Sequence, residues 1–465
     1  MSAGGRVSHL CRSDLSRLAA LEAALADAAA SLPKVRVGGV LTEVTPVSCR
    51  VSGLSHVVKL GDCVAWQGEC GTQVGEIVRI DDANATVKPF EAQVKAALGT
   101  RVWRTSRPRL HPHLSWLGRT IDALGRPIDE SGPLIQGSEP YAVERVPPPP
   151  LRRQRVSTPV KTGVRVIDCF TPLCAGQRIG IFAGSGVGKS TLLSMLARSR
   201  GFDVAVVALV GERGREVREF LEDALGADRA RAVAVVSTGD ESPMMRRLAP
   251  KTAMAVAEFF RNLGKSVLLI VDSVTRFAHA AREVALAAGE PPVARGFTPG
   301  VFSDLPKLLE RAGPGEKDQG SITGIFSVLV DGDDHNDPVA DSIRGTLDGH
   351  IVLNRSIADQ GRYPAVDILA SVSRLAGGTW TPDERRVVTA LRALIASFEE
   401  TRDLRLMGGY RQGSDPELDN AVQIVPKLYE ALKQGPDDAA TPNVFQELAR
   451  LLSGELAAGR AHGAT

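Results

Sequence analysis

The stretch that decides the fold is Ala183-Gly184-Ser185-Gly186-Val187-Gly188-Lys189-Ser190-Thr191. An apolar run typical of a strand, residues 178–182, precedes it, and a run typical of a helix, residues 192–196, follows it. A strand, a glycine-rich turn and a helix in this order are the context that a phosphate-binding loop requires. We therefore predict a nucleotide site in which residues 184–191 surround the phosphates.

The residue types of this loop fit that task. Glycines let backbone N–H groups crowd around a polyphosphate, and the helix N-terminus adds a partial positive charge. Lys189 would reach the terminal phosphates, and the hydroxyl of Ser190 would be a ligand of Mg²⁺. The strict motif has glycine at position 183, where this chain has alanine, but a methyl group at the mouth of the turn need not block the phosphates.

The composition is typical of a soluble globular protein of about three domains, with 465 residues, 43% hydrophobic and 24% charged. A net charge of +2 and an aromatic content of 5% argue against a nucleic-acid partner. The first five residues lack the apolar core of a signal peptide, and no apolar run approaches the ~20 residues of a membrane span. The six cysteines have no CxxC spacing, which favours reduced thiols in the cytosol.

The amino-terminal part divides into a helix and a β-rich region. Residues 1–33 contain a predicted helix over 9–32, in which apolar residues recur every seven positions, and Pro33 ends it. This helix either packs on its own domain or binds a partner as an arm. Short β-branched runs separated by Gly and Asp over residues 34–100 predict a small β-barrel, to which we assign no chemistry.

The remainder predicts an α/β domain over 101–376 and a helical domain over 377–465. The proline run 147–150 is typical of an extended crossing between modules. Apolar runs at 204–210, 232–236 and 266–271 alternate with amphipathic stretches, which indicates a parallel sheet covered by helices. The fold class is therefore α/β: a P-loop core with a parallel sheet, preceded by a small β-barrel and followed by a helical domain.

Ligands of such sheets bind at the carboxyl ends of the strands, so the residues that follow each run are candidates. Asp272 follows an apolar run, as does the carboxylate that holds the water shell of Mg²⁺ in nucleotide sites. Glu212 also follows a strand and could polarise an attacking water, and Arg213 beside it could meet phosphate charge. For Glu216, a catalytic role and a favourable charge at a helix start remain equally open.

Two of the four tyrosines, Tyr363 and Tyr410, lie in loop-like settings where an exposed ring could stack on a base. The residues alone leave both open as packing residues.

Taken together, these motifs resemble the catalytic subunits of rotary ATP synthases and, more closely, the type III secretion ATPases, with the flagellar protein export ATPases nearest. The resemblance covers nearly the whole chain, and its blocks are residues 182–191, 211–216, 272–276, 289–292, 320–338 and 371–374. It implies ATP and Mg²⁺ as cofactors and a homohexameric ring. It makes Ala183 a trait of the family.

The resemblance also implies roles for single residues. Glu212 would activate water, Arg213 would bind phosphate, and Asp272 would hold the Mg²⁺ shell. Arg374 would be an arginine finger inserted into the site of the neighbouring subunit. Tyr363 and Tyr410 would contact adenine.

The function implied is ATP hydrolysis that energises export of flagellar subunits at the cytoplasmic face of the inner membrane. Export chaperones, their substrates and a membrane export gate would be partners, and the N-terminal helix would bind a stator-like regulatory protein. Three alternatives remain: a virulence injectisome ATPase, an ATP synthase catalytic subunit, and a ring-shaped RNA-dependent helicase. The near-neutral charge counts against the last of these.

Overall fold

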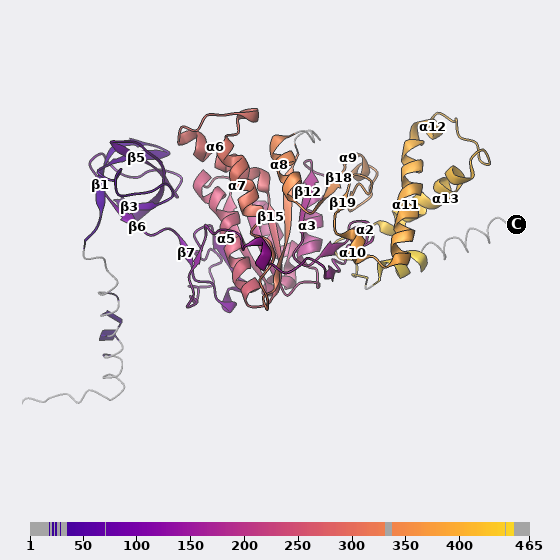
Figure 1. Ribbon diagram of the computed structural model, residues 1–465, viewed down its shortest axis with the longest axis horizontal. Helices are drawn as coiled ribbons and strands as arrows, with labels where there is room; N and C mark the ends of the chain where they lie inside the picture. The colour runs from indigo at the N-terminus through magenta and orange to yellow at the C-terminus, as the bar shows by residue number, and fades with distance from the viewer. Residues whose placement is uncertain are drawn as a thin grey trace, which may run out of the picture.

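The structure is a computed structural model, which describes residues 35–69, 71–330, 337–441 and 443–450, with isolated positions between 18 and 28. Apart from those isolated positions, the predicted helix over 9–32 lies outside the described residues, and so do residues 331–336 of the motif block 320–338. Figure 1 shows three units side by side along the longest axis: a barrel, a layered α/β unit and a helical arm. This is the predicted fold class.

The first unit is a closed six-stranded barrel with the strand order β1-β2-β5-β4-β3-β6. The strands are β1 Gly38–Thr45, β2 Ser48–Ser52, β3 Cys63–Gly68, β4 Gly71–Ile80, β5 Asn84–Pro89 and β6 Arg101–Thr105. Burial alternates along β4, as expected when one face of a strand lines a core. That core includes Val51, Trp66 and Ile77, none of which is exposed. β6 lies beyond residue 100, since the barrel closes only when β6 pairs with β1.

The second unit is built on a nine-stranded sheet with the main order β19-β18-β12-β17-β15-β13-β14-β8. The pairs from β18 to β8 are parallel, and the short strands β19 and β16 pair antiparallel. Its strands are β8 Thr120–Asp122, β12 Arg178–Ala183, β13 Val204–Glu212, β14 Ala232–Thr238, β15 Ser266–Asp272, β16 Gly313–Pro314, β17 Ser321–Leu329, β18 Gly349–Leu353 and β19 Val372–Ser373.

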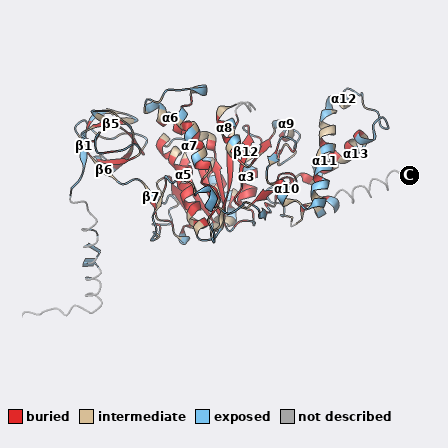
Figure 2. Cartoon of the chain, in the orientation of Figure 1, coloured by how far each residue is buried: buried red, intermediate tan, exposed pale blue. Residues whose placement is uncertain are grey.

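Helices cover both faces of this sheet, and the buried residues alternate between two cores. Along β13, Val206 and Ala208 join the core under α5–α8, whereas Val207 and Leu209 join the core under α2 and α3. Figure 2 accordingly shows the central strands buried over most of their length, and β13 is buried at every position. The helices are α2 Arg165–Phe170, α3 Lys189–Ala197, α4 Gly214–Glu219, α5 Pro243–Asn262, α6 Val274–Ala287, α7 Pro299–Leu309, α8 Pro338–Thr346 and α9 Arg355–Ala358.

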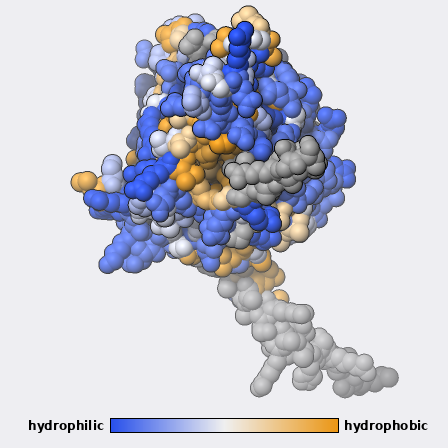
Figure 3. All heavy atoms as spheres, turned by 90° about the vertical axis from the view of Figure 1, so that its right-hand side faces the viewer, coloured by the Kyte–Doolittle hydropathy of each residue, from blue (hydrophilic) through white to orange (hydrophobic). Residues whose placement is uncertain are grey.

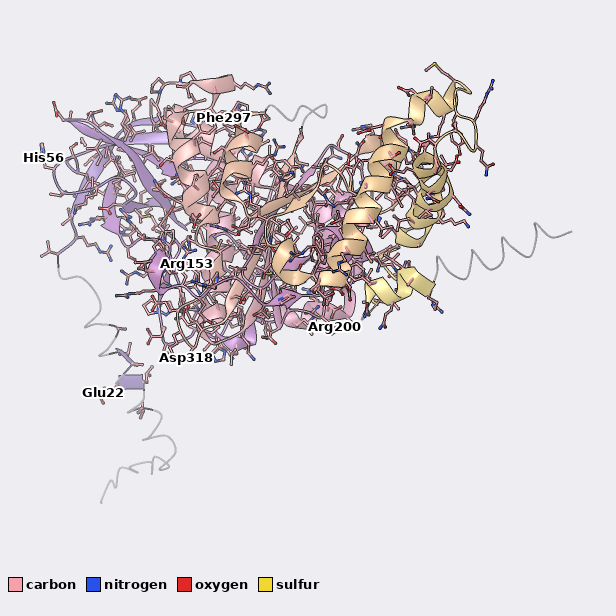
Figure 4. All side chains as sticks on the ribbon, turned by 45° about the vertical axis from the view of Figure 1, so that its right-hand side comes forward. Glu22, His56, Arg153, Arg200, Phe297 and Asp318 are labelled. Atoms are coloured by element: carbon pink, nitrogen blue, oxygen red, sulfur yellow. The ribbon has the colours of Figure 1, made fainter. Side chains whose placement is uncertain are left out.

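The proline run lies inside this unit, so its prediction as a crossing between modules was wrong. β8 precedes the run and already pairs with β14 in the sheet. The small two-stranded pairs also belong here: β7 Arg109–Leu110 with β9 Tyr141–Ala142, and β10 Pro159–Val160 with β11 Leu173–Cys174. Arg153, labelled in Figure 4, donates to the carbonyl oxygens of Glu310 and Ala312 and so fastens the run to the end of α7.

The third unit is a helical arm made of α10 Ala376–Thr379, α11 Pro382–Glu400, α12 Arg402–Leu406 and α13 Pro416–Leu432. The sequence Thr381-Pro382-Asp383-Glu384 predicts a capping box with proline at the first helical position, and the structure forms it: Thr381 and Glu384 exchange hydrogen bonds at the start of α11. Gln434, just past α13, ties the arm to the central unit: its backbone N–H donates to Tyr363 O and its side-chain amide N–H donates to Gly163 O. Its side-chain oxygen accepts a bond from Arg165 N–H. Among the described residues, no helix is long and apolar enough to cross a membrane.

Candidate active site

The phosphate-binding loop lies between β12 and α3, as the sequence predicts. Gly186 and Gly188 adopt positive φ angles of 77° and 88°, which L side chains avoid. A Cβ on Gly188 would also lie 3.2 Å from the ring of Tyr363, closer than an ordinary van der Waals contact, so the ring would have to move by a few tenths of an ångström. Arg355 of α9 donates to the carbonyl oxygen of Ser185 at 3.0 Å and steadies the loop from its other side.

Asp272 ends β15 beside this loop and is 3% exposed. Lys189 Nζ forms an ion pair with Asp272 Oδ1, and Ser327 Oγ of β17 donates to the same oxygen at 2.6 Å. The loop lysine and the strand-end carboxylate, two residues that the sequence predicted separately, are therefore in direct contact.

Glu212 ends β13, the strand next to β15, and is 8% exposed. Burial raises the pKa of its carboxyl group to about 7, and a hydrogen bond with Glu216 and the negative charge of Asp272 add to the rise. The cations Lys189 and Arg276 act in the opposite direction. A carboxyl group with a pKa near the operating pH is suited to accepting a proton from water.

Arg276 was not predicted as a site residue, although its motif was noted. It lies in the first turn of α6, and its Nη2 is 3.4 Å from Glu212 Oε2. Gly211 has a φ of +68°, and a Cβ there would come within 2.9 Å of the Arg276 side chain. The available signal was a cation one helical turn after the strand-end Asp272.

Arg213 and Glu216 lie at the start of α4, next to Glu212. The side chain of Arg213 is 80% exposed and lies 3.8 Å from Glu216. The hydrogen bond between Glu216 and Glu212 lowers the pKa of Glu216, so this pair shares one proton more readily than it holds two.

The two tyrosines have different surroundings. Tyr363 is 43% exposed and packs against Gly188 of the phosphate-binding loop. The hydroxyl of Tyr410 donates to Asp419 of α13, in the loop that joins α12 to α13 at the outer end of the arm. Figure 1 shows that end well away from α3, so the structure does not bring Tyr410 to the phosphate-binding loop that precedes this helix.

Arg374 follows β19 at one edge of the sheet and is exposed. Within the described part of the chain its backbone N–H donates to Asp348 O, and its guanidinium has no partner. An exposed arginine at a sheet edge is available to a neighbouring molecule.

Comparison with known proteins decides the family. Residues 163–373 match the ATP synthase alpha/beta family, nucleotide-binding domain, and residues 380–450 match the T3SS EscN ATPase C-terminal domain. A flagellum-specific ATP synthase of Agrobacterium fabrum is 56% identical, over 95% of this chain and 92% of the relative. One of Rhizobium meliloti is 57% identical, over 89% of each chain.

The chain belongs to the family of flagellum-specific ATP synthases and type III secretion ATPases. A solved structure of the assembled ATPase EscN from enteropathogenic E. coli has a TM-score of 0.83 and 39% identity, and covers 89% of this chain and 100% of that one. A type 3 secretion system ATPase of Xanthomonas euvesicatoria is 43% identical, over 90% of this chain and 94% of the relative. The chain is thus an ATPase of the flagellar and type III export class, and this is favoured over the synthase and helicase alternatives.

Membership of this ATPase family implies a nucleotide, and the residues fit a Mg²⁺ ion that accompanies it. No cluster of three or more His, Cys, Asp or Glu able to hold a metal occurs among the described residues. Mg²⁺ in nucleotide sites needs only one or two protein oxygens, because phosphates and waters complete its shell. Ser190, exposed at the start of α3, and Asp272 are the candidates.

Proposed function

We propose that the chain hydrolyses MgATP at a site shared between neighbouring copies of a homohexamer, and that hydrolysis energises export of flagellar proteins. One observation carries the proposal: Lys189 pairs with Asp272 at the end of β15, and Glu212 ends the adjacent strand β13. The guanidinium of Arg374, by contrast, lies at the sheet edge and has no partner among the described residues. One copy then supplies the loop and the base, and the next supplies the arginine.

In this proposal the triphosphate takes the place of Asp272 as the partner of Lys189. Backbone N–H groups of residues 184–188 and the N-terminus of α3 hold the phosphates. Ser190 and Asp272 would hold Mg²⁺, which would supply positive charge that offsets the charge of the phosphates. Asp272 keeps its bond from Ser327, so its orientation is fixed when Lys189 moves.

Glu212 in its charged form accepts a proton from the attacking water. Arg276 keeps that carboxylate oriented and favours its charged form. Arg213 and the neighbouring copy's arginine at position 374 meet the charge that develops on the transferred phosphoryl group. Tyr363, exposed beside Gly188, offers a ring on which the base stacks.

The identities of 56% and 57% to the flagellum-specific relatives of Agrobacterium fabrum and Rhizobium meliloti favour flagellar export over an injectisome, since the type 3 secretion system ATPase of Xanthomonas euvesicatoria is 43% identical. We infer that the chain acts at the cytoplasmic face of the inner membrane, with export chaperones, their substrates and a membrane export gate as partners. We also propose that the N-terminal helix binds a stator-like protein. A second EscN structure, described as a complex with its central stalk EscO, supports a stalk partner for the assembled ring.

The test is steady-state ATP hydrolysis with and without Mg²⁺ by the wild type, Glu212→Gln and Lys189→Ala. We expect Mg²⁺-dependent turnover that falls on the order of 10²- to 10⁴-fold in Glu212→Gln. Glu222→Gln is the matched control, because Glu222 is an exposed glutamate that pairs only with Arg218 in the described structure. Turnover by Glu212→Gln equal to that of the control would overturn the proposal.

A further inference from the structure

Arg362, next to the tyrosine that lies beside the phosphate-binding loop, stacks on Tyr429 of the helical arm. The guanidinium of Arg362 lies over the ring of Tyr429, with Cζ 3.7 Å from the ring centre. Tyr429 belongs to α13, and its hydroxyl donates to Glu399 of α11 at 2.7 Å. The stack therefore rests on both long helices of the arm at once.

Arg362 immediately precedes Tyr363, the tyrosine that packs on the phosphate-binding loop. The carbonyl oxygen of Tyr363 accepts a hydrogen bond from Gln434 N–H at 2.9 Å. The backbone of residues 362–363 is thus held by the arm at two points, while the Tyr363 ring lies against Gly188. Direct contacts of Arg362 and Tyr363 therefore connect the arm to the phosphate-binding loop.

Tyr429 is the residue that the Arg362 guanidinium contacts, through the stack on its ring and a hydrogen bond with its side chain. Arg362 Nε is buried and has no hydrogen-bond partner. Beside it lies a cavity of about 240 Å³ between residues 354–370 and the arm, lined by Arg362, Tyr429 and Glu399 among others. Figure 3, which faces the arm end of the molecule, shows a group of hydrophobic residues among hydrophilic ones there. On the side of this cavity the Arg362 side chain is not tightly packed, whereas Ala365 and Val366 of the same segment are buried. We therefore expect loss of the stack to let Arg362 and the adjoining Tyr363 shift.

We propose that Arg362 is a positioning residue, which by stacking on Tyr429 holds Tyr363 in the place that the base of the nucleotide requires. The inference rests on the proposed function, since it presumes a nucleotide at the phosphate-binding loop. It adds to that function that contacts of the helical arm help to set the affinity for the base of the nucleotide.

The test separates the base from the phosphates. We would measure KM and kcat for ATP, and the inhibition constant of inorganic tripolyphosphate with Mg²⁺, for the wild type, Arg362→Ala, Arg362→Lys and Tyr429→Leu. Loss of a stack of this kind should raise KM for ATP by roughly 3- to 30-fold in Arg362→Ala and in Tyr429→Leu. We expect a smaller rise in Arg362→Lys, and unchanged inhibition by tripolyphosphate, which has no base.

Arg405→Ala is the matched control, because Arg405 stacks on Phe398 of the arm at 3.6 Å but does not adjoin Tyr363. The double variant Arg362→Ala/Tyr429→Leu should have a KM close to that of either single variant, since one contact is lost in all three. Three results would overturn the inference. They are an equal loss of affinity for ATP and for tripolyphosphate, an unchanged KM for ATP in Arg362→Ala, and a rise in KM for ATP in Arg405→Ala as large as that in Arg362→Ala. A wild type that binds ATP no more tightly than tripolyphosphate would instead remove the base site of the proposed function itself.

Discussion

Arg276 Nη2 lies 3.4 Å from Glu212 Oε2, so a cation from the first turn of α6 faces the carboxylate that ends β13. The two side chains come from different strand–helix connections and meet only because β13 and β15 are neighbours in the sheet. The contact links the protonation state of the proposed base to an arginine that is not itself proposed to transfer protons.

Arg276→Ala should move the pH dependence of hydrolysis. Burial raises the pKa of Glu212 to about 7, and Arg276 lowers it, so loss of the cation raises it further. Since the charged carboxylate is the active form, the rise of kcat/KM with pH should shift to higher pH. Arg276→Lys, which keeps a positive charge, should shift it less. An unchanged profile in Arg276→Ala would show that this arginine does not act on Glu212.

Tyr363 and Tyr410 should differ in their effect on ATP binding. Tyr363→Ala removes the ring beside Gly188 and should raise KM for ATP by roughly 5- to 100-fold, a range typical of losing an aromatic stack on a base. Tyr363→Phe should keep most of the affinity. Tyr410→Ala should leave KM unchanged, because its hydroxyl is bonded to Asp419 at the outer end of the arm. A raised KM in Tyr410→Ala would restore the role implied by the resemblance.

Asp129 should matter for stability and not for turnover. It accepts two hydrogen bonds from Arg119, at 2.7 and 2.8 Å, and a third from Thr120 N–H at 2.8 Å. Burial alone would raise its pKa, but these bonds outweigh burial and lower the pKa to about 2. Asp129→Asn should therefore lower the free energy of unfolding by about 1–3 kcal/mol at pH 7.

The sign of its pH dependence follows from that shift. A carboxyl group whose pKa is lower in the folded state stabilises the protein above the ordinary pKa of 3.8 and loses that contribution as the pH falls toward 2. Urea unfolding at pH 7 and at pH 3 should show that the difference in the free energy of unfolding between the wild type and Asp129→Asn is smaller at the lower pH. Asp437→Asn is the control: its ion pair with Arg198 is 89% exposed on the aspartate side, and exposed pairs contribute little. A difference between the wild type and Asp129→Asn that is larger at pH 3 than at pH 7 would contradict this account.

The sequence predicted the fold well where the signals are local. The glycine-rich loop, the buried runs that became β13, β14 and β15, and the capping box at Thr381 all depend on residues close together in the chain. β8 was missed because Thr120–Asp122 is only three residues long and becomes a strand by pairing with β14, more than a hundred positions later. Pairing at such a distance leaves no periodicity to detect.

The site was predicted in part for the same reason. Lys189, Asp272 and Glu212 each follow a recognisable local pattern. Arg276 and Ser327 became visible only when the strand order brought β17, β15 and β13 side by side. Tyr410 was assigned by analogy, and its position depends on how α12 and α13 fold against each other, which no local pattern records.

The central claim is that each active site combines Glu212 of one copy with Arg374 of the next. The measurement is ATP hydrolysis by Glu212→Gln and Arg374→Ala, alone and mixed in equal amounts, over a range of protein concentrations. Each variant alone should be nearly inactive, on the order of 10³-fold for loss of the arginine. In a randomly mixed ring about one interface in four carries both intact groups, so activity should recover and should increase with concentration.

Arg374→Ala mixed with the double variant Glu212→Gln/Arg374→Ala is the control, since no intact interface can form, and it should remain inactive. Recovery in the first mixture and none in the second is the predicted result. A first mixture no more active than the sum of its two parts, or an Arg374→Ala variant that alone hydrolyses ATP at the wild-type rate, would contradict a site shared between copies.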